Sequence, residues 1–258
     1  MTLIIGVRCH DGIVVAADSA VSTGPTALPL GRKLTLHTSD PLIVGVAGSV
    51  PFGQRLCGAL HDHMKSFRTG PVARSLTKLR EAIKPLVEDE WKLAEQQAKA
   101  QNNSQIVLQQ AGFQLVVAYP LDSTPCLVSV AHSCQPMFIG PDPLTFTTAG
   151  SGQHLAEPFM YFVRRVLWKN KTPSLADGTL GALWAMRHAI QTNPGGIGGD
   201  VQIMQLTVSG KDVVGHELEP SEFQEHDQCL GELEDHIQTW ARKIDPTTTA
   251  ETPIPPPP

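Results

Sequence analysis

Runs of apolar, β-branched residues near the start of the chain alternate with short polar breaks. Such runs occupy residues 3–9 and 12–18, and the break between them, at 10–12, is typical of a tight hairpin. A second pair of runs lies at 33–38 and 42–48. The first forty-eight residues are therefore predicted to form two hairpins of largely buried strands.

The pattern then changes to the 3.6-residue period of helices, and it returns to strands and helices once more. Four apolar stripes with helical spacing are predicted: Phe52, Leu56, Leu60 and Met64; Leu76, Leu79, Ile83, Leu86 and Leu93; Leu155, Phe159, Phe162 and Val166; Leu175, Leu183, Met186 and Ile190. Further strands are predicted at 113–119, 126–132, 136–139, 144–148, 201–208 and 213–218. Residues 95–110 lack periodicity, and we expect a helix end that runs into an exposed loop.

The order of these elements is strands, two helices, strands, two helices, strands. Two sheets that each need cover on one face, with a helix pair available for each, predict an α+β protein built as a four-layer α-β-β-α sandwich. We assign residues 2–218 to this domain. Residues 219–245 are expected to form an acidic helical extension, and the Pro- and Thr-rich residues 246–258 a disordered tail.

Composition narrows the class of protein. The formal net charge of −5 and the lack of a Lys/Arg cluster argue against a nucleic-acid partner. The five cysteines have no C-x-x-C spacing and indicate free thiols rather than disulfides or a metal site. With no secretory leader and no apolar run of about 20 residues, we expect a cytoplasmic protein that does not span a membrane.

Thr2 is the candidate nucleophile. If Met1 is removed, the threonine carries a free α-amine beside its own hydroxyl, and this amine can serve as the base that the hydroxyl needs. Such a pair requires a nearby positive charge and a carboxylate that holds the charge in place. Lys33 begins the third apolar run and Asp18 ends the second, so both are available.

Four sequence blocks carry a resemblance to a known family. They are Thr2-Leu-Ile-Ile-Gly, Asp11-Gly-Ile-Val-Val-Ala-Ala-Asp-Ser, Lys33-Leu and Val46-Ala-Gly-Ser. In order and spacing they resemble the proteasome β-type peptidases of the N-terminal nucleophile hydrolase class. A Met-Thr start and Ile197-Gly-Gly-Asp-Val are similar to the HslV type, and the longer chain best resembles the betaproteobacterial proteasome homologues.

The resemblance implies a role for each catalytic position. Lys33 lowers the pKa of Thr2, and Asp18 orients Lys33. The backbone N–H of Gly48 faces the oxyanion of the tetrahedral intermediate. Ser151 hydrogen-bonds near the Thr2 amine and relays its proton.

The same alignment implies a set of substrate-binding residues. They are Val21, Ser22, Gly31, Val46 and Val50, and their largely apolar character predicts apolar side chains at the substrate position before the cleaved bond. Two residues common in the family are absent: an arginine at the position of Ala20, and an aspartate near residues 194–195. The missing aspartate leaves open how Ser151 and the amine are organised.

The resemblance thus implies a self-compartmentalising threonine endopeptidase without a cofactor or metal. Stacked homo-oligomeric rings are expected, a tetradecamer rather than a dodecamer, with peptides or unfolded proteins as substrates and an unfoldase partner unknown. Two alternatives stay open. One is a catalytically weak ring-forming scaffold or binding protein, and the other is an N-terminal nucleophile amidohydrolase of small amides.

Overall fold

The computed structural model describes residues 2–22, 27–28, 31–140, 143–193 and 196–244, with only the backbone given at residues 21–22 and 27–28. The chain divides into two compact units, Met1–Glu219 and Pro220–Pro258. Each unit is described by itself below.

The first sheet of the larger unit contains the N-terminal hairpin. Its five strands run in the order β10-β1-β2-β11-β12, and every neighbouring pair is antiparallel. The strands are β1 (Ile4–Arg8), β2 (Gly12–Asp18), β10 (Phe146–Ala149), β11 (Val201–Ser209) and β12 (Asp212–Leu218). Ile4 lies opposite Ala17 on one side and Ala149 on the other, so Thr2, two residues before Ile4, is a neighbour of the segment that follows Ala149.

The second sheet is also five-stranded and antiparallel, in the order β5-β6-β7-β8-β9. Its strands are β5 (Leu34–His37), β6 (Leu42–Gly48), β7 (Phe113–Leu121), β8 (Thr124–Ala131) and β9 (Pro136–Ile139). A separate two-stranded ribbon joins β3 (Val21–Ser22) and β4 (Ala27–Leu28). The predicted strands all form, with ends shifted by up to a few residues.

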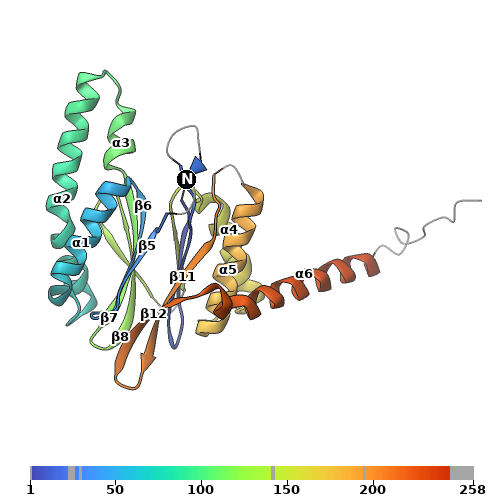
Figure 1. Cartoon of the computed structure of the whole chain (residues 1–258). Coiled ribbons are helices and arrows are strands. Elements are labelled where there is room, and N and C mark those ends of the chain that lie inside the picture. Colours follow the sequence, from blue (N-terminus) through green and yellow to red (C-terminus); the bar gives the residue numbers. More distant parts are fainter. Residues whose placement is uncertain (1, 23–26, 29–30, 141–142, 194–195, 245–258) are drawn as a thin grey trace, which may run out of the picture. The chain divides into compact units, whose positions relative to one another are not determined.

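Helices cover the outer face of each sheet (Figure 1). The helices α1 (Val50–Phe67) and α2 (Val72–Ala100) pack over the second sheet, whereas α4 (Gln153–Val166) and α5 (Leu175–Thr192) pack over the first. The two sheets lie face to face between these helix pairs. The predicted four-layer α-β-β-α sandwich is therefore confirmed.

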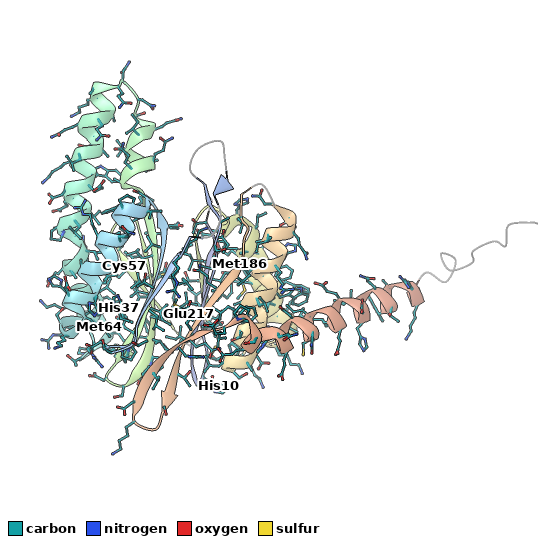
Figure 2. All side chains as sticks on the ribbon, viewed as in Figure 1. His10, His37, Cys57, Met64, Met186 and Glu217 are labelled. Atoms are coloured by element: carbon teal, nitrogen blue, oxygen red, sulfur yellow. The ribbon has the colours of Figure 1, made fainter. Side chains whose placement is uncertain are left out.

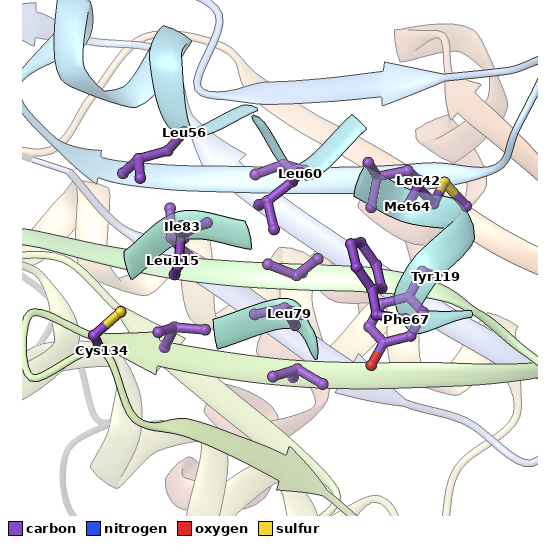
Figure 3. Packing of buried hydrophobic residues seen from close by; sticks show 14 of the residues in the cluster. Leu42, Leu56, Leu60, Met64, Phe67, Leu79, Ile83, Leu115, Tyr119 and Cys134 are labelled. Carbon is purple, nitrogen blue, oxygen red and sulfur yellow. The ribbon is translucent and has the colours of Figure 1, made fainter. Parts of the chain in front are cut away.

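Buried hydrophobic side chains fill the spaces between the layers. The core between α1, α2 and the second sheet includes Leu60, Met64, Phe67, Leu79 and Tyr119 (Figure 3). The core between the sheets is made of inward-facing strand side chains of both sheets. Alternate residues of the central strands of the second sheet thus serve these two cores, which explains their nearly continuous apolar sequence.

The prediction of an exposed loop within residues 95–110 is wrong. Helix α2 continues to Ala100, and a further helix, α3 (Gln105–Ala111), packs back against it. Glu, Gln, Lys and Ala have high helix propensity, which offsets the weak apolar periodicity. Ala94 and Ile106 are buried, so apolar contacts stabilise these helices although the sequence shows little apolar periodicity here.

The predicted apolar stripe of α4 is wrong as well. The residues that α4 buries are Ala156, Met160 and Val163, whereas Phe162 is partly exposed. Both sets have helical spacing, so periodicity alone cannot choose between them. Phe159, a member of the predicted stripe, packs its ring edge-on against Trp184 of α5, with ring centroids 5.2 Å apart. At this residue the predicted stripe therefore contacts the neighbouring helix.

The smaller unit contains a 3-10 turn, Pro220–Phe223, followed by the helix α6 (Gln224–Ile244). The helix lies within residues 219–245, the segment predicted to be an acidic helical extension, and the predicted tail, residues 246–258, lies outside the described part of the chain. Within the described residues, no helix is both long and apolar enough to cross a bilayer.

The α1–α2 core makes a prediction about stability. Replacing the fully buried Leu60 by Ala should lower the free energy of unfolding by about 2–5 kcal/mol, because the cavity is only partly refilled. The same change at Leu93, which is 52% exposed, should cost no more than about 0.5 kcal/mol. Urea denaturation of both variants at one protein concentration checks this, and equal losses would contradict the described packing.

Candidate active site

The carboxylate of Asp18 is the centre of the candidate site. Asp18 ends β2 and is completely buried. Its Oδ1 accepts hydrogen bonds from the Lys33 ammonium and from the backbone N–H of Leu3, each at 2.8 Å, and its Oδ2 accepts one from the N–H of Gly198 at 3.3 Å. One carboxylate therefore joins the lysine to the segment that begins with Thr2.

Burial also changes the basicity of Lys33. The Lys33 side chain is 7% exposed, and its desolvation lowers the pKa of the ammonium below the usual value for lysine. The hydrogen bond and the negative charge of Asp18 oppose this shift. Asp18 thus compensates part of the cost of holding a positive charge inside the protein.

The backbone around Lys33 is fastened by a residue that the sequence did not reveal. Gln202 of β11 accepts hydrogen bonds through Oε1 from the N–H groups of Lys33, at 3.1 Å, and Leu34, and donates through Nε2 to the carbonyl of Gly31. The only sequence signal was a long polar side chain within a mostly apolar strand. The neighbouring Arg32 pairs instead with Glu217.

The loop after β10 brings Ser151 to the start of the chain. The Ser151 Oγ accepts a hydrogen bond from the Thr2 backbone nitrogen at 3.1 Å, and the N–H of Gly152 donates to the Thr2 carbonyl at 3.0 Å. Gly150 has a φ of +95°, and a Cβ there would lie 2.2 Å from the Thr2 oxygen. Only glycine permits this approach of the two backbones.

Gly48 ends β6 opposite Phe113 of β7. Its φ is +141°, and a Cβ at this position would lie 2.6 Å from the carbonyl oxygen of Gly112. Both features demand glycine here. The backbone at the end of β6 is thus exposed in the cleft wall without a side chain to cover it.

A cleft of about 1600 Å³ contains these groups. Thr2, Lys33, Gly48 and Ser151 all line it, so the structure brings together at one surface four of the five residues predicted to be catalytic. Asp18 lies behind that surface. The remaining wall comes from the first turns of α1, from α3 and from the start of β7; Figure 2 labels His37 and Cys57, which line it too.

The predicted substrate-binding residues are placed less uniformly. Val46 and Val50 line the cleft, whereas Gly31 is not among its lining residues and binds Gln202 through its carbonyl. The side chains of Val21 and Ser22 lie outside the described part of the structure. Among the described residues, no three His, Cys, Asp or Glu side chains are grouped so that they could hold a metal ion.

Solved structures with this fold carry the name Anbu. A Gly-1 mutant of Anbu from Hyphomicrobium sp. strain MC1 matches with a TM-score of 0.67 and 14% identity, over 93% of this chain and 97% of that one. Anbu from Yersinia bercovieri, described as an ancestral beta-subunit, matches with a TM-score of 0.64 and 15% identity, over 92% and 96%. A helical assembly of the Anbu complex from Pseudomonas aeruginosa gives 0.62 and 15%, over 99% and 98%.

No family model matches the chain, and no curated protein matches it either. The interpretation as a proteasome β-type or HslV-like peptidase, nearest to the betaproteobacterial homologues, is therefore wrong: the structural neighbours named above are Anbu proteins, a proteasome-like but distinct group. The blocks behind that interpretation lie in buried strands and close backbone contacts. Because the shared fold itself constrains those positions, they do not distinguish one group from another.

The pairing of Lys33 with Asp18 makes a prediction about charge. Changing Asp18→Asn should lower the pKa of Lys33 further. Burial lowers this pKa, and the hydrogen bond and negative charge of the Asp18 carboxylate oppose that shift. Competitive acetylation at a series of pH values, read by mass spectrometry of the Lys33 peptide, measures this pKa. Glu217→Gln, which removes the partner of Arg32 instead, is the matched control and should leave Lys33 unchanged.

Proposed function

We propose that this protein is a threonine endopeptidase whose nucleophile is Thr2 after removal of Met1. The observation that supports this most directly is the shared carboxylate oxygen of Asp18, which binds both the Lys33 ammonium and the N–H next to Thr2. This contact fixes a buried positive charge close to the candidate nucleophile. A charge in that position favours deprotonation of both the hydroxyl and the α-amine.

In the proposed reaction the α-amine of Thr2, directly or through one water, takes the hydroxyl proton as Oγ attacks the peptide carbonyl. The resulting ammonium then gives its proton to the leaving amine, and an ester to Thr2 remains. Water hydrolyses this acyl-enzyme with the same amine as base. Ser151, whose Oγ lies 3.1 Å from the Thr2 nitrogen, is positioned to relay the proton.

Gly48 is proposed to stabilise the oxyanion of each tetrahedral intermediate through its N–H. The absence of a side chain at the end of β6 lets a carbonyl come close to the backbone there. A donor of this kind lowers the barrier by about 2.7–4 kcal/mol in well-studied hydrolases. The proposal therefore assigns Lys33 and Asp18 to activation of the nucleophile, and Gly48 to the developing negative charge.

The size of the cleft favours a peptide over a small amide. Sites for small molecules usually enclose about 300–1,000 Å³, whereas this cleft has about 1600 Å³ and crosses the ends of β5, β6 and β7. An extended chain can use such a length. An apolar side chain next to the cleaved bond would contact Val46 and Val50.

Removal of the hydroxyl of Thr2 is the test of this function. Thr2→Ala should lower kcat/KM on fluorogenic peptides at least about 10³-fold, because the nucleophile is lost. Thr2→Ser should keep measurable activity. An epoxyketone probe, which needs both the hydroxyl and the free amine, should add once to the wild-type chain and not to Thr2→Ala.

Thr77→Ala, an identical change on the exposed face of α2, is the control and should be as active as wild type. Intact mass shows beforehand whether Met1 has been removed. A wild-type chain that begins with Thr2 and yet neither cleaves peptides nor reacts with the probe would contradict the proposal. It would instead support the scaffold alternative.

We also propose that copies of this chain assemble, with stacked rings that form a tetradecamer preferred over a dodecamer. A peptidase that cleaves many sequences would also cleave folded proteins around it. Enclosing its active sites in an internal chamber prevents this. The Anbu complex from Pseudomonas aeruginosa is an assembly, described as helical. Partly exposed aromatic and aliphatic side chains on α4, namely Tyr161, Phe162 and Val166, provide apolar surface for such contacts.

Light scattering coupled to size exclusion, followed by electron microscopy, measures this assembly. The expected result is a closed particle whose mass is fourteen times that of the chain and does not change with concentration. A mass of twelve chains would favour six-fold rings, and a mass that grows with concentration would favour an open helix. A monomer at micromolar concentration would contradict the proposed chamber.

A further inference from the structure

A chain of hydrogen bonds connects the Ser151 loop to the second sheet, and its first member is Gln114. We propose that Gln114 is a positioning residue that holds the Gly150–Ser151 loop against Thr2, and that Gln153 and Glu157 orient its amide. This inference rests on the proposed function of Thr2 and Ser151. It adds a residue for which the sequence gave no signal.

Each contact in the chain has a defined direction. The Gly150 N–H donates to the Gln114 Oε1; the Gln114 Nε2 donates to the Gln153 Oε1 at 3.5 Å, and the Gln153 Nε2 donates to the Glu157 Oε2 at 2.9 Å. A backbone N–H can only donate and an ionised carboxylate can only accept. Fixed ends therefore set the orientation of both glutamine amides between them.

Gln114 reaches the loop from the opposite side of the sandwich. It lies on β7, opposite Ala47 of β6, in the second sheet. Gly150 follows β10 at the edge of the first sheet. The Gln114 side chain thus crosses the gap between the two sheets at the cleft, whose lining includes both residues.

The loop is also held from its own side. The Gly152 N–H donates to the Thr2 carbonyl, and a ring nitrogen of His154 lies 2.8 Å from the Ser151 carbonyl. The Gly152 contact fixes the loop relative to the first sheet, whose strand β1 follows Thr2, and the His154 contact holds the loop to the start of α4. Gln114 fixes it relative to the second sheet, which carries Gly48, so the serine hydroxyl and the candidate oxyanion donor keep one separation.

The sequence lacks the aspartate that the resemblance to proteasome β-type peptidases leads one to expect, and this left the organisation of Ser151 open. The described residues organise Ser151 through an uncharged amide backed by a carboxylate two residues further along the chain of hydrogen bonds. Gln114 thus positions the loop without adding a charge of its own to the site.

The test compares Gln114→Leu with Gln114→Glu in the full-length, assembled protein. Leucine has nearly the same volume but cannot accept from Gly150, so kcat should fall about 10- to 100-fold with KM changed less than about threefold. Glutamate keeps the acceptor and should restore most of kcat. Its charge should move the acidic limb of the pH profile to higher pH, because a nearby carboxylate raises the pKa of the amine.

Gln110→Leu is the matched control, because Gln110 is bonded to Gln97 on an exposed face and is absent from the cleft lining. Its kcat should stay within about twofold of wild type. Hydrogen exchange of the peptide spanning residues 149–153, read by mass spectrometry, should be at least about tenfold faster in Gln114→Leu than in Gln110→Leu.

The outcomes separate the two proposals. If the wild type is active but Gln114→Leu matches it in kcat and in exchange at 149–153, the positioning role is overturned and the proposed function stands. If the wild type does not react at Thr2, the proposed function fails, and with it the catalytic purpose of the contact. Loss of kcat without restoration by glutamate, and without faster exchange, also overturns the inference.

Discussion

A buried carboxylate needs a positive charge or hydrogen-bond donors around it, and at Asp18 this requirement joins four separate segments of the chain. The donors come from Lys33, Leu3 and Gly198, while Asp18 itself ends β2. Removing an ion from water costs several kcal/mol, so such a group is tolerated only where partners surround it. The N-terminal strand, the segment before β5 and the segment before β11 therefore have to meet at one place. The candidate nucleophile lies where they meet, and its surroundings are set by the electrostatics of the core rather than by a flexible loop.

The sandwich supplies the second constraint, because the candidate site needs both sheets. Thr2 and Ser151 belong to the first sheet and its edge, whereas Gly48 and Gln114 belong to the second. Two packed sheets with a shared core hold these edges at a nearly constant distance. Hydrogen bonds such as the one from Gly150 to Gln114 then fix the position of each loop at this edge. A site at the joint edge of two sheets can accept an extended chain, which agrees with the proposed peptide substrate.

The likeness to Anbu structures and the local chemistry support different levels of the interpretation. At 14–15% identity, TM-scores of 0.62–0.67 establish the fold and nothing finer. One fold can carry many chemistries, so function has to be argued from the residues in the cleft. The lowered pKa of Lys33, its contact with Asp18 and the backbone geometry of Gly48 and Gly150 are such residue-level arguments. They do not depend on which group of proteasome-like proteins the chain resembles.

The sequence by itself determined the architecture and the candidate residues close to the N-terminus. Period-two and period-3.6 patterns depend on local burial, and the strands of both sheets could be read from them. Patterns failed where two faces of one helix were apolar, as at Phe162 and Met160 of α4, and where helix propensity without apolar periodicity built α3. Only the tertiary structure decided that Gln202 fastens Lys33 and that Gln114 reaches Gly150. Such polar contacts join residues far apart in the chain, and their geometry exists only after the two sheets have packed, so no local pattern in the sequence encodes them.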